Sequence, residues 1–287
     1  MKLETLAKKD QQIVLMAGKN GSGKSGAIAS YAELGPLKLY DLDKRARGIL
    51  GIASVLGKQV IDNIEVIQPD FEKGWAPIDK ELDLDLIKSK QGSFPYKTVA
   101  FEGAATMQKY LISDSQRLRG KGGRSRGAID FWVPDDYNYC SMGFFQFYYQ
   151  YAMLMKCNVI VSCWMVDRWG KPKAGENDKE KENAYAESER IGDKLLLTDK
   201  LSEEVPGYFD EIYSFEKEET SLGGGGVKFV VTFESTLAKT CYPSLRKQKR
   251  LDITNKSFYR ELQRITQADR AAFDPSILAT TSITPKV

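Results

Sequence analysis

The sequence contains no histidine and only four cysteines in 287 residues. Without imidazole, the chain lacks histidine general bases, histidine-activated nucleophiles and the ligands of most zinc sites. The cysteines show no C-x-x-C spacing and mostly adjoin apolar stretches, which favours free buried thiols in a reducing compartment: Cys140, Cys157, Cys163 and Cys241. We therefore expect no zinc, and a general base, if there is one, should be a carboxylate.

Long apolar runs are also absent. No stretch approaches the roughly 18 apolar residues of a membrane-spanning helix, and the N-terminal MKLETLAKKDQQ lacks the apolar centre of a signal peptide. The net charge is only +3, so any affinity for nucleic acid must come from local basic clusters. These absences predict a cytoplasmic protein without a membrane partner.

A glycine-rich motif stands out among the features that are present. Residues 18–25 read GKNGSGKS, which matches the phosphate-binding pattern G-x-x-x-x-G-K-S. A short apolar run at 12–17 precedes it and a helix-compatible segment at 25–34 follows, the order that phosphate binding requires. Lys24 would supply charge to the β- and γ-phosphates, and the Ser25 hydroxyl would be a Mg²⁺ ligand. The predicted nucleotide-binding residues are Gly18, Asn20, Gly21, Ser22, Gly23, Lys24, Ser25 and Gly26.

Short β-type runs alternate with helical segments along the chain. The expected strands are 12–17, 37–41, 64–67, 97–102 and 158–164, and the expected helices are 25–34, 77–90, 104–119 and 138–156. This alternation predicts an α/β fold with three layers, a mostly parallel sheet with helices on both faces. Two further runs, 212–215 and 227–233, flank a polar, glycine-rich segment and predict an antiparallel hairpin at the sheet edge.

The segment 138–156 is expected to be a largely buried helix. Its apolar residues Met142, Phe145, Tyr149 and Met153 fall three or four positions apart. The predicted organisation is an N-terminal extension (1–11), one main domain (12–255), and a C-terminal helix with a flexible tail (256–287). Residues 268–287 show no clear periodicity.

Acidic residues follow two of the expected strands. Glu102 ends the run 97–102, while Asp41 and Asp43 end the run 37–41. Because the carboxyl ends of parallel strands meet at one edge of a sheet, these acids should approach the phosphate-binding loop. Glu102 is the candidate metal ligand or base, and Asp41 or Asp43 the candidate group that polarises water; the alternative for each is a solvated turn residue. Ser162, near the end of run 158–164, is either a sensor of the γ-phosphate or an ordinary buried hydroxyl.

Two basic clusters are candidates for contacts with other phosphates. The first combines five cations with four glycines and no acid, and aromatic residues follow it: Arg117, Arg119, Lys121, Arg124 and Arg126, then Phe131, Trp132, Tyr137 and Tyr139. Cations that neutralise phosphates and rings that stack on bases suit single-stranded DNA. The alternative is a surface loop followed by core aromatics. The second cluster, Arg246, Lys247 and Lys249, could act on a neighbouring subunit as an arginine finger does, or be a basic surface run.

This order of elements resembles the RecA-type core of P-loop NTPases, and more narrowly the phage-encoded RecA-core ATPases of single-strand annealing and recombination. The matching stretches are GKNGSGKS (18–25), KLYDLD (38–43), KTVAFEGA (97–104), NVIVSCW (158–164), VPGYFDEI (205–212) and LAKT (237–240). The resemblance implies an ATPase that couples Mg²⁺-ATP to single-stranded DNA in recombination or replication, in a ring or filament of identical subunits. Glu102 stands where the family has aspartate, and no separate N-terminal polymerisation domain is visible.

Two other functions are compatible with the same motif. A small-molecule kinase would use the arginine-rich segment as a lid over the phosphates. A nucleotide-gated assembly or packaging protein would bind the triphosphate but hydrolyse it slowly or not at all.

Overall fold

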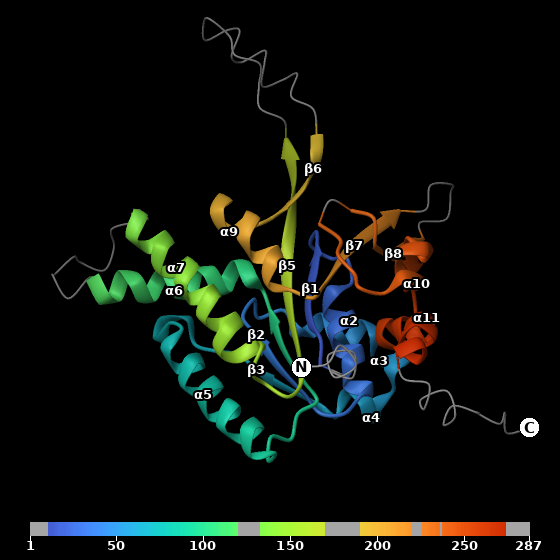
Figure 1. Cartoon of the computed structure of the whole chain (residues 1–287), viewed down its shortest axis with the longest axis horizontal. Coiled ribbons are helices and arrows are strands. Elements are labelled where there is room, and N and C mark those ends of the chain that lie inside the picture. Colours follow the sequence, from blue (N-terminus) through green and yellow to red (C-terminus); the bar gives the residue numbers. More distant parts are fainter. Residues whose placement is uncertain (1–10, 120–132, 170–189, 220–225, 236, 274–287) are drawn as a thin grey trace, which may run out of the picture.

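The computed structural model of the chain describes residues 11–119, 133–169, 190–219, 226–235 and 237–273 (Figure 1). The strands are β1 (Ile13–Gly18), β2 (Leu37–Asp41), β3 (Ile64–Ile67), β4 (Thr98–Glu102), β5 (Asn158–Trp169), β6 (Arg190–Leu195), β7 (Glu211–Glu219), β8 (Val227–Thr232) and β9 (Arg250–Asp252). The α-helices are α2 (Lys24–Ser30), α3 (Ala53–Leu56), α4 (Lys58–Ile61), α5 (Ala76–Gln91), α6 (Ala104–Arg119), α7 (Pro134–Gln146), α9 (Asp199–Glu204), α10 (Pro243–Gln248) and α11 (Phe258–Phe273). Short 3₁₀ segments are η1 (Tyr31–Glu33), η2 (Ala46–Ile52), η3 (Phe71–Lys73) and η6 (Val205–Tyr208), and η5 (Phe147–Ala152) is a π-helix.

The strands form one nine-stranded sheet in the order β3-β2-β4-β5-β1-β7-β8-β9, with β6 paired to β5. From β3 to β7 all neighbours are parallel, whereas β8 and β9 add antiparallel pairs at one edge. The structure therefore confirms a mixed α/β fold with a mostly parallel sheet and an antiparallel hairpin. Strands β6 and β9 were not expected.

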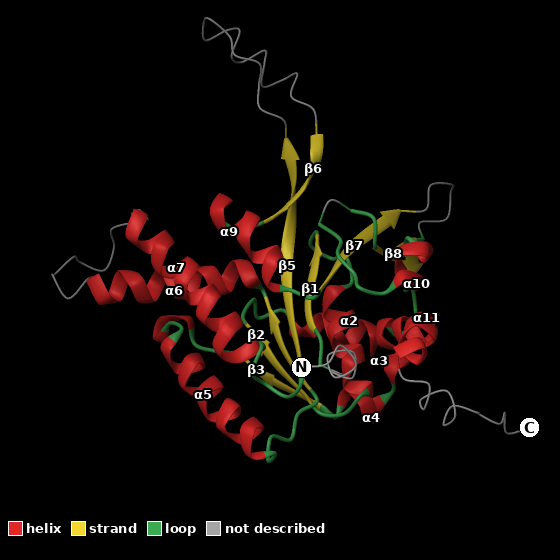
Figure 2. Ribbon diagram, in the orientation of Figure 1, coloured by secondary structure: helices red, strands yellow, loops and turns green. Residues whose placement is uncertain are grey.

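Helices cover both faces of the sheet (Figures 1 and 2). Ile13 and Leu15 of β1 face a core that includes side chains of α5, α6 and α7, and Val14 and Met16 face a second core with α2 and α11. Because both faces are covered, the central strands are buried along their whole length and read in the sequence as apolar runs.

The prediction for residues 138–156 needs correction. The segment is α7 followed by the π-helical η5, and the four residues expected inside are exposed: Met142 by 71%, Phe145 by 52%, Tyr149 by 48% and Met153 by 40%. The buried side is formed instead by Cys140, Phe144, Phe147 and Tyr151. Both sets of residues have helical spacing, so periodicity alone does not tell the buried face from the exposed one. After residue 147 the wider π turn also shifts which residues face the core.

The C-terminal prediction also needs correction, because α11 continues regularly through positions 268–273. The start of α11 contacts α2 and η1: the Tyr259 N–H donates to Ser30 Oγ at 2.9 Å, and the Arg260 side chain pairs with Glu33 at 2.8 Å. Ala271, close to the helix end, is buried. The predicted extension at 1–10 and the tail at 274–287 lie outside the described residues. None of the helices in the described ranges has the length and apolar content needed to cross a bilayer.

Candidate functional site

The glycine-rich loop connects the end of β1 to the start of α2, at the carboxyl edge of the parallel strands. Gly21 (φ 71°) and Gly23 (φ 94°) adopt left-handed backbone conformations that other residues rarely take. A Cβ on Gly18 would lie 2.4 Å from the carbonyl oxygen of Phe215 in β7. The glycines are therefore required by the path of the loop and by the close approach of β7.

Lys24 turns back into this loop instead of extending into solvent. Its Nζ donates to the carbonyl oxygens of Gly18 (2.7 Å) and Lys19 (2.8 Å), and the residue is only 6% exposed. Burial lowers the pKa of the Lys24 ammonium to about 8, while Coulomb attraction from Cys163, Glu102 and Asp43 acts in the opposite direction. A buried cation bonded mainly to neutral carbonyls favours an anion in the same loop.

Ser25 meets Glu102 across the site. The Ser25 hydroxyl donates to Glu102 Oε1, although β4, which carries Glu102, is separated from β1 by β5. Burial raises the pKa of the Glu102 carboxyl, and the Ser25 hydrogen bond and Lys24 oppose that change. Among the described residues, Glu102 Oε2 has no hydrogen-bond partner although it is buried. A buried carboxylate oxygen with no donor, beside a hydroxyl, is suited to a hard cation.

These two side chains fit magnesium in the form in which nucleotides carry it. Within the described ranges, no three His, Cys, Asp or Glu side chains form a cluster able to hold a metal ion by themselves. Mg²⁺ commonly takes one or two protein ligands and completes its octahedron with phosphate oxygens and water. Ser25 Oγ and Glu102 Oε2 would be those protein ligands.

The two aspartates after β2 have different environments. Asp41 is fully buried, and its carboxylate accepts hydrogen bonds from the backbone N–H groups of Arg45 (2.8 Å) and Ala46 (2.9 Å) and from Gln68 Nε2 (2.8 Å). These bonds fix the turn that follows the strand. Asp41 is thus an anchor of the loop, whereas we had expected it to share a role with Asp43.

Asp43 lies beside the residue that follows Glu102. A Cβ on Gly103 (φ 107°) would come within 2.3 Å of Asp43 Oδ1, so the carboxylate rests on the bare backbone there. Thr106 Oγ1 donates to the same oxygen. Burial raises the pKa of the Asp43 carboxyl, against the hydrogen bond from Thr106 and the charge of Arg45. Asp43 is therefore the half-buried acid next to the Ser25–Glu102 pair.

Ser162 lies between the two strands that carry the site. In the sheet it pairs with Met16 of β1 on one side and with Glu102 of β4 on the other. Its hydroxyl accepts a 3.1 Å hydrogen bond from the Gly103 N–H. Ser162 thus holds the backbone directly after Glu102, which positions that carboxylate.

Sequence reasoning missed Arg45 and Trp164. Arg45 Nη1 donates to Asn20 Oδ1 at 3.1 Å, and the guanidinium carbon lies 4.7 Å from the centre of the Trp164 ring. Lys19 is tied to the same strand by an ion pair with Asp167 at 3.0 Å. The only sequence feature that pointed to Arg45 was its position shortly after Asp41 and Asp43, and a basic residue at that position does not by itself predict a contact.

The first basic cluster is only partly described. Arg117 and Arg119 belong to α6 (Ala104–Arg119), whose bounds agree with the expected helix at 104–119. Arg117 approaches Asp114 at 3.7 Å and donates to the Phe71 carbonyl at 3.3 Å. Lys121, Arg124 and Arg126, with Phe131 and Trp132, lie outside the described residues. Tyr137 and Tyr139 are partly exposed on α7.

The second basic cluster is largely engaged within the chain. Arg246 donates twice to the Thr240 carbonyl, at 3.0 and 2.6 Å, and Lys249 pairs with Glu234 at 2.5 Å. Lys247 is exposed near the end of α10. Action on a neighbouring subunit stays a prediction.

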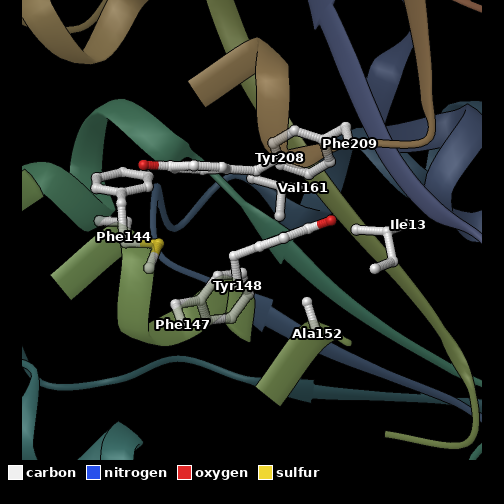
Figure 3. Close-up of a pocket in the computed structure, with 9 residues that line it drawn as sticks. Ile13, Phe144, Phe147, Tyr148, Ala152, Val161, Tyr208 and Phe209 are labelled. Carbon is white, nitrogen blue, oxygen red and sulfur yellow. The ribbon is translucent and has the colours of Figure 1, made fainter. Parts of the chain in front are cut away.

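A small apolar hollow lies on the opposite side of the sheet from α2 (Figure 3). Residues lining it include Ile13, at the start of β1, and the rings of Phe144, Tyr148 and Tyr208. Its volume is about 10 Å³, and a single water needs that much space. The hollow is therefore a packing gap and not a ligand pocket.

Comparison with known proteins does not assign the chain to a family. A scan against models of protein families found no match, and a search of curated proteins also found none. The functional argument therefore depends on the residues around the glycine loop.

Proposed function

We propose that this chain binds a nucleoside triphosphate with Mg²⁺ at the loop 18–25 and hydrolyses its terminal phosphate bond. The observation that carries the proposal is the convergence of buried Lys24 with the Ser25–Glu102 pair, in which one carboxylate oxygen lacks a donor. Ser25 and Glu102 meet there although they are 77 positions apart in the chain. The site thus has an ammonium that can bind an anion and two oxygens that can bind a metal.

Each residue has a distinct role in this proposal. Lys24 stabilises negative charge on the phosphates, and Ser25 with Glu102 would hold Mg²⁺, which would neutralise part of the phosphate charge. Asp43 orients the attacking water and takes its proton, since a carboxylate whose pKa is raised is a better base. Ser162 keeps Glu102 in place. Phosphoryl transfer depends mainly on such positioning and electrostatics, and the site supplies both.

We further propose that the chain is a RecA-like ATPase whose nucleotide state controls binding of single-stranded DNA in phage-type recombination or replication. The mostly parallel sheet with its antiparallel hairpin supports this proposal, as does the basic composition of residues 117–126. The choice of ATP, a homo-oligomer and a location in the host cytoplasm follow from the resemblance to phage RecA-core proteins.

Nucleotide binding and turnover, measured together, test this function. Calorimetric titration with ATP and GTP plus Mg²⁺ gives affinity, and phosphate release is followed with and without single-stranded DNA at two salt concentrations. We expect ATP to bind and DNA to stimulate turnover, less so at high salt because phosphate contacts release counterions. Asp43→Asn is the control that separates the steps: it removes the proposed base but keeps Lys24, Ser25 and Glu102, so it should bind ATP and lose turnover.

The alternatives predict other outcomes of the same experiment. Absence of binding heat with either nucleotide would contradict the site itself. Phosphate transfer to a metabolite, without any effect of DNA, would favour a kinase. Tight binding without turnover in the unmodified chain would favour a nucleotide-gated assembly protein.

A further inference from the structure

We propose that Arg45 is a catalytic residue of this site, an arginine that the same chain supplies to the terminal phosphate and that Trp164 holds in place. The inference rests on the proposed triphosphate function and adds to it. No second subunit is needed to supply this cation.

The backbone of Arg45 is held in place independently of its side-chain contacts. Its N–H donates to Asp41 Oδ1 at 2.8 Å, and Asp41 is itself held by Gln68. Arg45 is therefore anchored at the buried end of β2, the strand that pairs with β4 in the sheet. Its side chain reaches the loop from the strand-end side that also carries Asp43.

The guanidinium is held between the phosphate-binding loop and Trp164 in the middle of β5. Asn20, in the middle of that loop, accepts its Nη1–H at 3.1 Å, and the Trp164 ring lies 4.7 Å from the guanidinium carbon. Trp164 pairs in the sheet with Gly18, the first residue of the motif. A ring at that position holds a guanidinium by cation–π attraction beside the start of the loop.

The negative charge around the loop favours such a cation. Glu102, Asp41 and Asp43 bring three carboxylates to the strand ends, whereas Lys24 is enclosed against the carbonyls of Gly18 and Lys19. A guanidinium carries five N–H donors, and Asn20 accepts from one of them. The remaining donors can meet phosphate oxygens whose charge grows in the transition state. Arg246, the earlier candidate, is instead bonded to the Thr240 carbonyl.

Kinetics of Arg45 variants in the full-length chain test this proposal. For Arg45→Ala we expect kcat for ATP to fall at least about 100-fold, with KM changed less than about threefold, because the contact strengthens in the transition state. Arg45→Lys should recover only part of the rate, since lysine lacks the planar fork. Arg47→Ala, which removes the same charge from an exposed position two residues away, is the matched control.

Trp164 is tested as a positioning residue by rescue. Trp164→Leu should lower kcat by about tenfold, and Trp164→Phe, which keeps an aromatic face for the guanidinium, should recover most of that loss. Equal rates in the Leu and Phe variants would remove Trp164 from the proposal.

The outcomes separate this inference from the function on which it rests. A wild-type chain that binds neither ATP nor GTP overturns both. A chain that hydrolyses ATP but shows the same kcat in Arg45→Ala and Arg47→Ala, within about twofold, overturns the role of Arg45 alone. If the wild type binds without measurable turnover, affinities decide: Arg45→Ala must weaken ATP more than ADP, and equal weakening overturns the proposal.

Discussion

Two lysines of this protein are buried to a similar degree but have opposite surroundings. Lys38, on β2, is 4% exposed and forms ion pairs with Asp85 of α5 at 2.5 Å and with Glu81 at 2.6 Å. Lys24, on the glycine loop, is 6% exposed, and among the described residues no carboxylate lies within ion-pair distance of its ammonium. One buried charge is neutralised inside the fold, and the other is not.

The difference separates a charge that the fold itself neutralises from one that we propose a triphosphate neutralises. Burying a charge is unfavourable unless it is paired and hydrogen-bonded. Lys38 meets that condition with protein groups alone, so it joins α5 to the sheet. Lys24 has hydrogen bonds but no contacting anion, and burial lowers its pKa to about 8. The missing counter-charge is what a triphosphate would supply.

Removing each of the two charges should have opposite effects on activity and stability, and the largest expected effect is the loss of activity without Lys24. Lys24→Met keeps the length of the side chain but deletes the ammonium, and we expect kcat/KM for ATP to fall by about 10³-fold, as when one transition-state donor is lost. The unfolding free energy, measured in urea, should stay equal or rise because a buried charge without a counter-ion disappears. Substantial residual turnover in Lys24→Met would contradict the assignment.

Lys38→Met should have the reverse effect. It leaves the Asp85 carboxylate buried without its cation, and we expect a loss of about 3 kcal/mol in unfolding free energy. ATP affinity of the folded protein should change less than about twofold. Adding Asp85→Asn should restore part of the stability, since it removes the charge left behind. Wild-type stability in Lys38→Met would show that the pair does not hold α5 to the sheet.

The pH dependence of stability gives the smallest but most specific difference. The pKa of Lys24 is about 8 in the folded chain against 10.5 in the reference state, so the unfolded chain holds more protons between these values. The unfolding free energy should therefore be independent of pH below that window and rise by about 2 kcal/mol between pH 8 and 9.5. Lys24→Met should lack this component, whereas Lys38→Met should keep it. Parallel pH profiles for wild type and Lys24→Met would contradict it.

The sequence predicted those parts of the site that depend on regular structure. Strands buried on both faces appear as apolar runs, and the ends of parallel strands share one edge, so the approach of Glu102 to the loop was predictable. The contact between Ser25 and Glu102 is a consequence of that geometry.

Features set by irregular segments could not be predicted in the same way. The path from Asp41 to Arg45 is fixed by carboxylate–backbone hydrogen bonds, which leave no periodic pattern in the sequence. In α7 the buried and the exposed apolar residues both have helical spacing, so periodicity does not say which face is covered, and the π turn at Phe147–Ala152 then changes the spacing that periodicity assumes. The partners of Lys38 are two residues of a helix more than forty positions away in the chain.

The docking of α11 on α2 has a consequence for biosynthesis. Ser30 at the end of α2 accepts the Tyr259 N–H, and Glu33 in the following η1 pairs with Arg260; these partners are 229 and 227 positions apart in the chain. A chain emerging from the ribosome exposes the apolar surface of α2 until α11 has been translated. This layer is therefore completed only once α11 is available, and contacts between such distant parts of the sequence slow folding.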